Sequence, residues 1–415
     1  MSRTSRDLRI AVVGAGFAGQ GHAFGFRNAG MADALAGIEV VLDTVVDPDT
    51  ALAETVARRY GFARTAADVS EILDNPEIEV VSVALPSFLS VPVLGSLLRA
   101  GKHVLGEKPL GRSGAEAAEL VEIADRTESV AAVGFSYRRL PAVAQLRDAV
   151  RDGAIGTPYF ARAHFFSDYA LDPSSPMAWR FDREASGGGT ILDMATHTID
   201  ALEYVLGDVG EVLACTLDTT ITRRPGEDGQ THEVTNDDTA LISLRFAGGA
   251  LASILSSRVG AGCPIELGLE VFGSTGHVRY AFNRPNEWIL YQKDLGEPGT
   301  DAPRTIIPGP SARYFTDTMP MAARGNATGY GEAFVAQMQE LLRAVVAGEP
   351  MDTSFKAAAR TMRVVVDLPL VPVMPMILMR GSIFKSFFAC ATEMICAPFC
   401  AASDSNLAFA SVRIK

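Results

Sequence analysis

Short apolar runs alternate with amphipathic stretches along the first 140 residues. The runs that predict β-strands are residues 10–13, 38–49, 78–86, 102–110 and 129–138. The stretches between them that have a helical period are residues 50–61, 91–101 and 114–127. Strands that alternate with helices are typical of a doubly wound parallel sheet, whose ligands bind at the carboxyl ends of the strands. We therefore expect an α/β domain over residues 1–140.

From about residue 150 the strand-like runs are joined mostly by glycine-rich turns. They are residues 157–170, 211–224, 237–258, 265–282 and 287–292. In one of them Ile242 and Leu244 alternate with polar residues, which gives the strand one buried and one less apolar face. The apolar stripe over 354–366 predicts a final helix. The pattern predicts a second, α+β domain over residues 141–366 with an antiparallel sheet.

Residues 187–207, GGGTILDMATHTIDALEYVLG, are predicted to form one helix that begins after a run of glycines. Asp193 and His197 are four residues apart on it, so they share a face, with Cβ atoms about 5–6 Å apart. Periodicity leaves three interpretations open: a satisfied polar pair, half of a metal site, or part of an active site. A metal site needs further ligands. The six histidines are scattered and form no HExxH motif, so we expect no metal.

Residues 367–415 are rich in proline, methionine and cysteine and have no steady period. The apolar run 368–379 is broken by prolines and is too short to span a bilayer. Cys390, Cys396 and Cys400 lack the CxxC spacing of a metal site. We expect this tail to be foreign to the fold, as after a change of reading frame, and poorly ordered. A membrane-surface or partner-binding tail is the alternative.

Composition and charge narrow the choice of partners. The net charge of −12 argues against a nucleic-acid partner, because phosphate binding needs a concentrated basic surface. The amino-terminal segment lacks the apolar stretch of a secretory signal, and the five cysteines include no CxxC pair. We expect a cytoplasmic protein with a small-molecule partner, no nucleic-acid partner and no membrane association.

Gly14, Gly16 and Gly19 follow the first strand run in G-x-G-x-x-G spacing. The first glycine permits a tight turn, the second lets the backbone approach a pyrophosphate, and the third lets the helix pack closely on the strand. The phosphates then lie at the amino terminus of the helix. Phe17 and Ala18 belong to the same turn and are expected cofactor neighbours. This segment predicts a dinucleotide site.

Asp47 ends the second strand run, where an acidic residue can accept hydrogen bonds from an adenosine ribose. A carboxylate there favours NAD over NADP, because a 2′-phosphate would meet like charge. The alternative is that Asp47 only caps the turn before Pro48.

Three further motifs follow in order. They are E-K-P at 107–109, G-F-S-Y-R-R at 134–139 and GG-x-x-x-D-x-x-x-H at 188–197. Together with the glycine turn, this set strongly resembles the glucose-fructose oxidoreductase, inositol dehydrogenase and rhizopine catabolism (Gfo/Idh/MocA) family over about residues 8–365. The resemblance implies an N-terminal Rossmann domain and a C-terminal α+β domain with an open, mostly antiparallel sheet. It also implies NAD(P)-dependent oxidation or reduction at a sugar or cyclitol carbon.

Site residues are implied by the same resemblance. The catalytic residues are Lys108, Asp193 and His197. The cofactor-binding residues are Gly14, Gly16, Phe17, Ala18, Gly19, Asp47, Pro86, Ser87, Glu107 and Lys108. One departure is visible, because the loop often written T-P-x-x-x-H in relatives has Leu85 and Ser90 in place of threonine and histidine. Members usually pair through the open sheet, so we expect a homodimer or homotetramer.

Substrate contacts are expected on both sides of the catalytic helix. The expected substrate-binding residues are Lys108, Tyr137, Arg138, Trp179, Arg180, Asp193 and His197. Trp179 and Arg180 precede the helix and can line a polyol pocket through ring stacking and hydrogen bonds to hydroxyls. The alternative is that Trp179 belongs to the core and Arg180 is solvated.

Oxidation of an alcohol needs a group that takes the hydroxyl proton while a hydride leaves the carbon, and histidine suits this because its pKa lies near neutrality. We expect His197 to act as the base, Lys108 to stabilise the developing alkoxide and Asp193 to orient the substrate. The predicted activity is that of an NAD-dependent dehydrogenase similar to inositol 2-dehydrogenase. The alternatives are a reductase of the same family with another carbonyl or sugar substrate, and a non-catalytic NAD-binding regulator.

Overall fold

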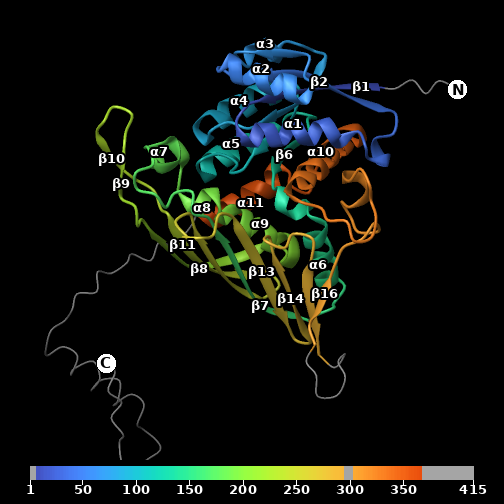
Figure 1. Cartoon of the computed structure of the whole chain (residues 1–415), viewed down its shortest axis with the longest axis vertical. Helices are drawn as coiled ribbons and strands as arrows, with labels where there is room; N and C mark the ends of the chain where they lie inside the picture. Colours follow the sequence, from blue (N-terminus) through green and yellow to red (C-terminus); the bar gives the residue numbers. More distant parts are fainter. Residues whose placement is uncertain (1–5, 294–301, 367–415) are drawn as a thin grey trace, which may run out of the picture. The chain divides into compact units, whose positions relative to one another are not determined.

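Two large sheets and a small two-stranded one, with helices packed on the large sheets, make up the part of the chain that the computed structural model describes, residues 6–293 and 302–366 (Figure 1). These residues fall in one unit, Met1–Val371. The predicted tail, 367–415, lies outside the described residues. Within the described ranges no helix is long and apolar enough to cross a bilayer. The cytoplasmic location stays a prediction.

The first sheet has six parallel strands in the order β3-β2-β1-β4-β5-β6. Their bounds are β1 Arg6–Val13, β2 Ile38–Val46, β3 Arg64–Ala66, β4 Ile78–Val83, β5 His103–Glu107 and β6 Ala131–Gly134. Ile10 and Val12 on β1 are fully buried, and so is Val80 on β4, as expected where helices cover both faces of a parallel sheet. The predicted doubly wound parallel sheet is confirmed.

Helices connect the strands of this sheet. Their bounds are α1 Phe17–Ala29, α2 Thr50–Tyr60, α3 Ser70–Leu73, α4 Ser87–Arg99 and α5 Gly114–Ala124, with a 3₁₀ turn η1 at Asp33–Leu35. Side chains cap the amino termini of two of these helices. At α2, Asp49 Oδ1 accepts a hydrogen bond from the amide of Leu52 at 3.0 Å. Ser113 Oγ caps α5 in the same way. Helix α4 begins before the predicted start at residue 91, and Pro92 lies inside it.

The second sheet has eight strands in the order β16-β15-β14-β13-β7-β12-β11-β8. Every neighbouring pair is antiparallel except β7 and β12. The bounds are β7 Pro158–Phe166, β8 Val209–Asp218, β11 Thr239–Phe246, β12 Leu251–Ser257, β13 Glu266–Gly273, β14 Gly276–Ala281, β15 Trp288–Gln292 and β16 Arg304–Ile306. The open, mostly antiparallel sheet is confirmed. A small hairpin, β9 Arg223–Pro225 and β10 Thr231–Glu233, was not predicted.

One face of the second sheet is covered by the helices α6 Pro141–Arg151, α8 Thr190–Asp193 and α9 Ala195–Leu206. The other short elements of this part are α7 Arg183–Ser186, which packs on α4, and the 3₁₀ turns η2 Ser136–Arg139, η3 Trp179–Phe181 and η4 Thr316–Thr318. Helix α9 packs on β7, β12 and β13, and α6 packs on β14 and β15 (Figure 1). On the opposite face Leu241, Leu251 and Leu255 remain exposed.

The two last helices return to the first sheet. Helix α10, Tyr330–Ala347, packs along α1, and α11, Phe355–Val366, packs on α5 and α9 (Figure 1). Phe334 and Met338 of α10 share a buried core with Ile10 of β1. The predicted helix at 354–366 is confirmed, with Met362 of its stripe buried. The division of the chain near residues 140 and 366 stays a prediction.

The prediction of one continuous helix over 187–207 is wrong. Helix α8 begins at Thr190, and Met194 separates it from α9 with φ −117° and ψ −45°. In a continuous helix the amide of His197 would donate to the carbonyl of Asp193. Here it donates to the carbonyl of Met194 at 3.1 Å. The Asp193 carbonyl instead accepts a hydrogen bond from Lys108 Nζ at 2.7 Å, so the lysine of the first sheet replaces a helical bond.

Candidate active site

A cleft of about 750 Å³ lies where the carboxyl ends of β1, β4 and β5 meet the α8–α9 segment. The predicted residues that line it are Gly16, Phe17, Ala18, Pro86, Ser87, Glu107, Lys108, Tyr137, Trp179, Arg180, Asp193 and His197. A concave site at this edge of a parallel sheet is the usual place for a ligand. Gly14, Gly19, Asp47 and Arg138 are not among its lining residues.

The glycine turn has the shape that the dinucleotide prediction requires. Gly14 has φ +95°, and a Cβ atom on Gly19 would lie 1.7 Å from the Gly14 carbonyl oxygen, so the turn and the helix are in backbone contact. A Cβ atom on Gly16 would meet nothing within 4 Å. Because Gly16 lies at the amino end of α1 and faces open space, the turn fits a pyrophosphate.

Asp47 lies beside this turn. Its Oδ2 accepts a hydrogen bond from the amide of Ala15 at 2.7 Å, which joins the end of β2 to the glycine turn. Its Oδ1 accepts one from the amide of Asp49 at 2.9 Å, so Asp47 also caps the turn around Pro48. The turn cap is therefore present, and the position of Asp47 beside the glycine turn suits a ribose hydroxyl, so ribose binding stays a prediction.

Glu107 fixes the end of β5 through both carboxylate oxygens. Oε1 lies 3.0 Å from Nε2 of His22, a fully buried residue of α1, and Oε2 accepts the amide of Lys108 at 3.2 Å. Ser90 stands where relatives often have histidine, and its hydroxyl donates to the carbonyls of Leu85 and Pro86 at 3.1 and 3.2 Å. Ser90 thus closes the start of α4 and does not reach the cleft.

The start of α8 is held by Asp237, which precedes β11. Its carboxylate oxygens accept the amides of Gly189 and Ile191 at 2.9 and 2.8 Å. A Cβ atom on Gly189 would lie 1.7 Å from the Asp237 carbonyl oxygen, so this position of the glycine run is required by close backbone contact. A carboxylate at a helix amino terminus is favourable. Asp237 therefore anchors the segment that carries Asp193.

Lys108 and Asp193 form an ion pair across the cleft. Nζ of Lys108 lies 2.7 Å from Asp193 Oδ1 and 2.7 Å from the Asp193 carbonyl oxygen. The other carboxylate oxygen accepts a hydrogen bond from the hydroxyl of Tyr169 at 2.9 Å. Burial alone would raise the pKa of Asp193, but the Lys108 ammonium and these hydrogen bonds lower it well below its usual range. Asp193 is therefore a carboxylate.

His197 lies in the same wall of the cleft and is 6% exposed. Its ring contacts Tyr137 and Phe165 at centroid distances of 5.0 and 5.9 Å. Burial lowers the pKa of His197, and the nearby Lys108 ammonium lowers it further. The imidazole is therefore neutral near neutral pH and can accept a proton.

An aromatic and cationic group lies at the outer part of the cleft. The guanidinium of Arg180 stacks on Trp179 at 4.5 Å, and Phe88 of α4 meets the Trp179 ring edge-on at 6.3 Å. Trp179 is half-buried and Arg180 is exposed. Rings and guanidinium groups at a cleft suit a hydroxyl-rich ligand.

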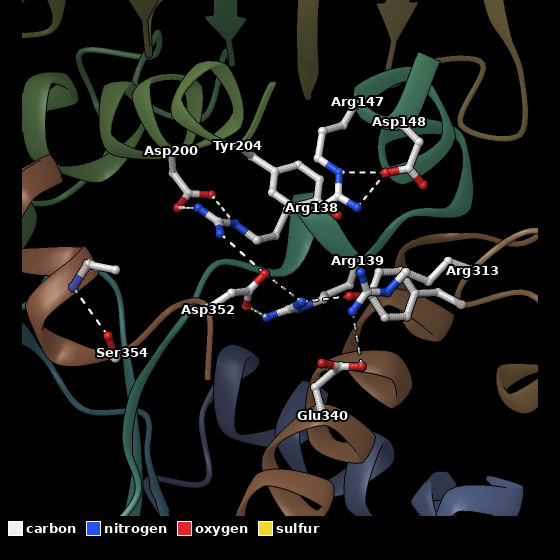
Figure 2. A network of polar contacts seen from close by, with 12 residues as sticks. Arg138, Arg139, Arg147, Asp148, Asp200, Tyr204, Arg313, Glu340, Asp352 and Ser354 are labelled. Atoms are coloured by element: carbon white, nitrogen blue, oxygen red, sulfur yellow. Dashed lines mark hydrogen bonds and ion pairs between the residues drawn. The ribbon is translucent and has the colours of Figure 1, made fainter. Parts of the chain in front are cut away.

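Arg138 is not brought to the cleft, contrary to the sequence prediction. It is 7% exposed, and its Nε donates to Asp200 Oδ2 at 3.0 Å while a second nitrogen bonds the other carboxylate oxygen (Figure 2). Nη1 lies 3.5 Å from Asp352, and the guanidinium covers the ring of Tyr204. Tyr137 and Arg138 are successive residues of the tight turn η2, so their side chains point in different directions. Tyr137 lines the cleft, and Arg138 points into the interior.

Three residues that position the site were missed: His22, Tyr169 and Asp237. Each acts on a partner 24 to 85 residues away, and no local motif marks such a pair. Asp237 carries the one available signal, since it precedes a predicted strand in the polar triplet Asn-Asp-Asp. Among the described residues no group of three or more His, Cys, Asp or Glu side chains could hold a metal ion.

Comparison with known families finds two matches that together span most of the described chain. Residues 8–135 match the family model described as oxidoreductase family, NAD-binding Rossmann fold. Residues 143–279 match the GFO/IDH/MocA C-terminal domain.

Similar proteins include sugar and cyclitol dehydrogenases. Levoglucosan dehydrogenase of Pseudarthrobacter phenanthrenivorans is 31% identical over 84% of this chain and 92% of its own. Myo-inositol 2-dehydrogenase of Thermotoga maritima is 27% identical over 71% of this chain and 80% of its own. The structure of levoglucosan dehydrogenase in complex with NADH and levoglucosan superposes with a TM-score of 0.81 at 30% identity, over 87% of this chain and 95% of that one.

Proposed function

The chain belongs to the GFO/IDH/MocA family of NAD-binding oxidoreductases, and on that premise we propose that it moves a hydride between NAD and a secondary alcohol of a sugar or cyclitol. One observation carries the proposal: Lys108, at the end of a strand of the NAD-binding sheet, bonds Asp193 in the same cleft as His197. The names of two relatives, for levoglucosan and myo-inositol, support an anhydrosugar or cyclitol as the first compounds to test.

When bound, NAD supplies the hydride acceptor or donor, its nicotinamide ring. The residues that would hold it are Gly14, Gly16, Phe17, Ala18, Gly19, Asp47, Pro86, Ser87 and Glu107. The Asp47 carboxylate favours NAD over NADP, because it would repel a 2′-phosphate.

Lys108 stabilises the substrate oxygen. A protonated lysine has three N–H donors, and Asp193 accepts two of them through its side chain and its carbonyl. One donor remains for the substrate hydroxyl, whose oxygen gains negative charge as the proton leaves. A positioned ammonium at that oxygen lowers the barrier of the chemical step.

His197 takes the hydroxyl proton in the oxidation direction and returns it in the reduction direction. Its lowered pKa keeps the ring neutral and ready to accept the proton. Tyr137 packs against the ring of His197, and Trp179 with Arg180 binds the remaining hydroxyls of the sugar. Arg138 is left out of the substrate site because its donors already bond Asp200 and Asp352.

The test is a screen of the purified protein. Levoglucosan, inositols, aldoses and 1,5-anhydrosugars are offered with NAD and with NADP, and the corresponding ketones with NADH. We expect turnover of at least one polyol with NAD, lost in His197→Ala and Lys108→Met while NAD still binds. Turnover only of carbonyl compounds identifies a reductase. NAD binding with no turnover of any compound identifies a regulator and refutes the proposal.

The exposed face of the second sheet supports a further part of the proposal, a homo-oligomer. A shallow hollow of about 640 Å³ on this sheet is lined by Leu241, Leu255 and Ile289 among others, and the two leucines are 50% and 37% exposed. Exposed apolar side chains gathered in a hollow are a feature of association sites, and the Arg162–Glu270 ion pair lines the same hollow. Light scattering should give a dimer or tetramer, and Leu241→Glu with Leu255→Glu should give a monomer.

A further inference from the structure

Tyr169 lies outside every motif that the family resemblance covers, yet it lines the cleft. It follows strand β7, in a short segment whose backbone is held from two sides. The Ala170 amide donates to the carbonyl of Arg258 at 3.1 Å, and the buried Arg224 guanidinium donates to the carbonyls of Ala170 and Asp172. Such a fixed backbone gives the Tyr169 side chain a defined direction.

The hydroxyl of Tyr169 completes the contacts of Asp193. Oδ1 of Asp193 pairs with Lys108 Nζ, and Oδ2 accepts the Tyr169 hydroxyl at 2.9 Å. The carboxylate is thereby held at both oxygens, so its plane cannot turn without breaking a charge-assisted hydrogen bond. Since Asp193 occupies two of the three Lys108 donors, the plane of this carboxylate decides where the third donor points.

We infer that Tyr169 is a positioning residue, which holds Asp193 and through it directs the free N–H of Lys108 at the substrate oxygen. The inference rests on the proposed function. Burial and the neighbouring Asp193 carboxylate raise the pKa of the phenol above its usual value. Tyr169 therefore remains a hydrogen-bond donor at working pH and does not exchange protons with the substrate.

Tyr169→Phe tests this role, because it removes only the hydroxyl of a residue that is 43% exposed. We expect kcat to fall about 10- to 100-fold, as for loss of a hydrogen bond to a charged group. KM and the Kd for NADH should change less than threefold. With a substrate deuterated at the carbinol carbon, the isotope effect on kcat should rise, because the chemical step becomes slower.

Tyr159→Phe is the matched control. Tyr159 lies on β7, the strand that precedes Tyr169, is 59% exposed and does not line the cleft. It should keep the parent kcat, KM and isotope effect. An unchanged kcat in Tyr169→Phe would overturn the inference.

A double-mutant cycle tests whether Tyr169 acts through Asp193. In the Asp193→Asn background, adding Tyr169→Phe should cost less than twofold in kcat, because the carboxylate that it holds is already gone. Full additivity of the two effects would mean that Tyr169 acts independently of Asp193 and would overturn the inference.

Labelling of Lys108 gives a readout that needs no substrate. Reductive methylation of the parent and of Tyr169→Phe is followed by peptide mass spectrometry, with the exposed Lys356 as the internal reference. Lys108 should be labelled several-fold faster in Tyr169→Phe and at the parent rate in Tyr159→Phe. If no sugar is turned over but this difference appears, the proposed function fails and the positioning contact stands. An equal labelling rate with an unchanged kcat overturns the positioning role.

Discussion

Two cation–carboxylate pairs tie the edge of the NAD-binding sheet to the α8–α9 segment, and they serve different ends. Lys108–Asp193 opens on the cleft and leaves one ammonium donor without a partner among the described residues. Arg138–Asp200 is buried, and Asp352 and the ring of Tyr204 cover the rest of its guanidinium (Figure 2). A basic residue in a family motif acts on a substrate only where a donor remains free and a cleft reaches it.

Asp200→Ala should have the largest effect, and on stability. It leaves the Arg138 guanidinium buried without its bidentate partner, and breaking a buried pair in this way costs about 3–5 kcal/mol in the free energy of unfolding. Urea unfolding followed by circular dichroism measures the loss.

Asp148→Ala is the matched control, because the Asp148 side chain is 47% exposed. Figure 2 shows its pair with Arg147. Its cost should stay below about 1 kcal/mol. Equal costs for the two variants would show that burial of the Arg138 pair does not matter.

Lys108→Met should reverse this pattern. We expect kcat to fall about 10²–10³-fold, because the donor at the developing alkoxide is lost, while the free energy of unfolding should fall less than in Asp200→Ala, because the Lys108–Asp193 pair opens on the cleft. Lys356→Met, at an exposed pair with Asp125, should change neither quantity. A large loss of stability without a loss of kcat in Lys108→Met would make the two pairs alike and reject the distinction.

Glu203 lies one turn after Asp200 on α9, and its shifted pKa makes the stability of the protein depend on pH. Burial raises its pKa to about 7 from the usual 4.5, against the hydrogen bond from Thr361. Between these values the folded state holds a proton that the unfolded state has released, so stability falls as the pH rises from about 4.5 to about 7. Glu203→Gln should remove the part of this fall that Glu203 causes, while Asp200, whose pKa burial raises to about 6, keeps its own part.

Thermal and urea unfolding at two pH values measure the effect. Near pH 8, Glu203→Gln should be more stable than the parent by on the order of 1–3 kcal/mol, and near pH 5 the two should agree. Glu119→Gln, at an exposed position of α5, should match the parent at both. A stability difference between Glu203→Gln and the parent that is the same at both pH values would contradict a raised pKa for Glu203.

The smallest expected effect is on the pH–rate profile. Because burial lowers the pKa of His197, kcat/KM for oxidation should begin to fall only below the usual histidine value of 6.5. Lys108 contributes to this lowering, so the residual activity of Lys108→Met should begin to fall at a higher pH than the parent activity. A shift in the opposite direction would place His197 outside the influence of Lys108.

Much of the fold could be predicted because the spacing of apolar residues follows which faces of a strand or helix are buried. Strands such as β1, buried on both faces, and β11, buried on one, leave different periods in the sequence. The break at Met194 could not be predicted from this spacing. It accompanies a hydrogen bond from Lys108 to the carbonyl of Asp193, 85 residues later in the chain. The return of α10 to pack on α1 depends on contacts of the same long range.

The site could be predicted only in part, for the same reason. The strand-end rule placed Lys108 at the ligand edge, and the family resemblance added Asp193 and His197. Neighbouring positions in the turn η2 could not be told apart, so Arg138 was predicted to reach the substrate. Tyr169 was missed because its partner is set by the path of the segment after β7.

The most direct measurement follows the hydride itself. A polyol found by the screen is deuterated at the carbinol carbon and incubated with NAD and the protein, and the coenzyme is analysed by mass spectrometry. The account predicts that deuterium appears in NADH with the parent and with Asp148→Ala, and does not with Lys108→Met or His197→Ala over the same time. Deuterium transfer at the parent rate in Lys108→Met and His197→Ala would contradict the central claim.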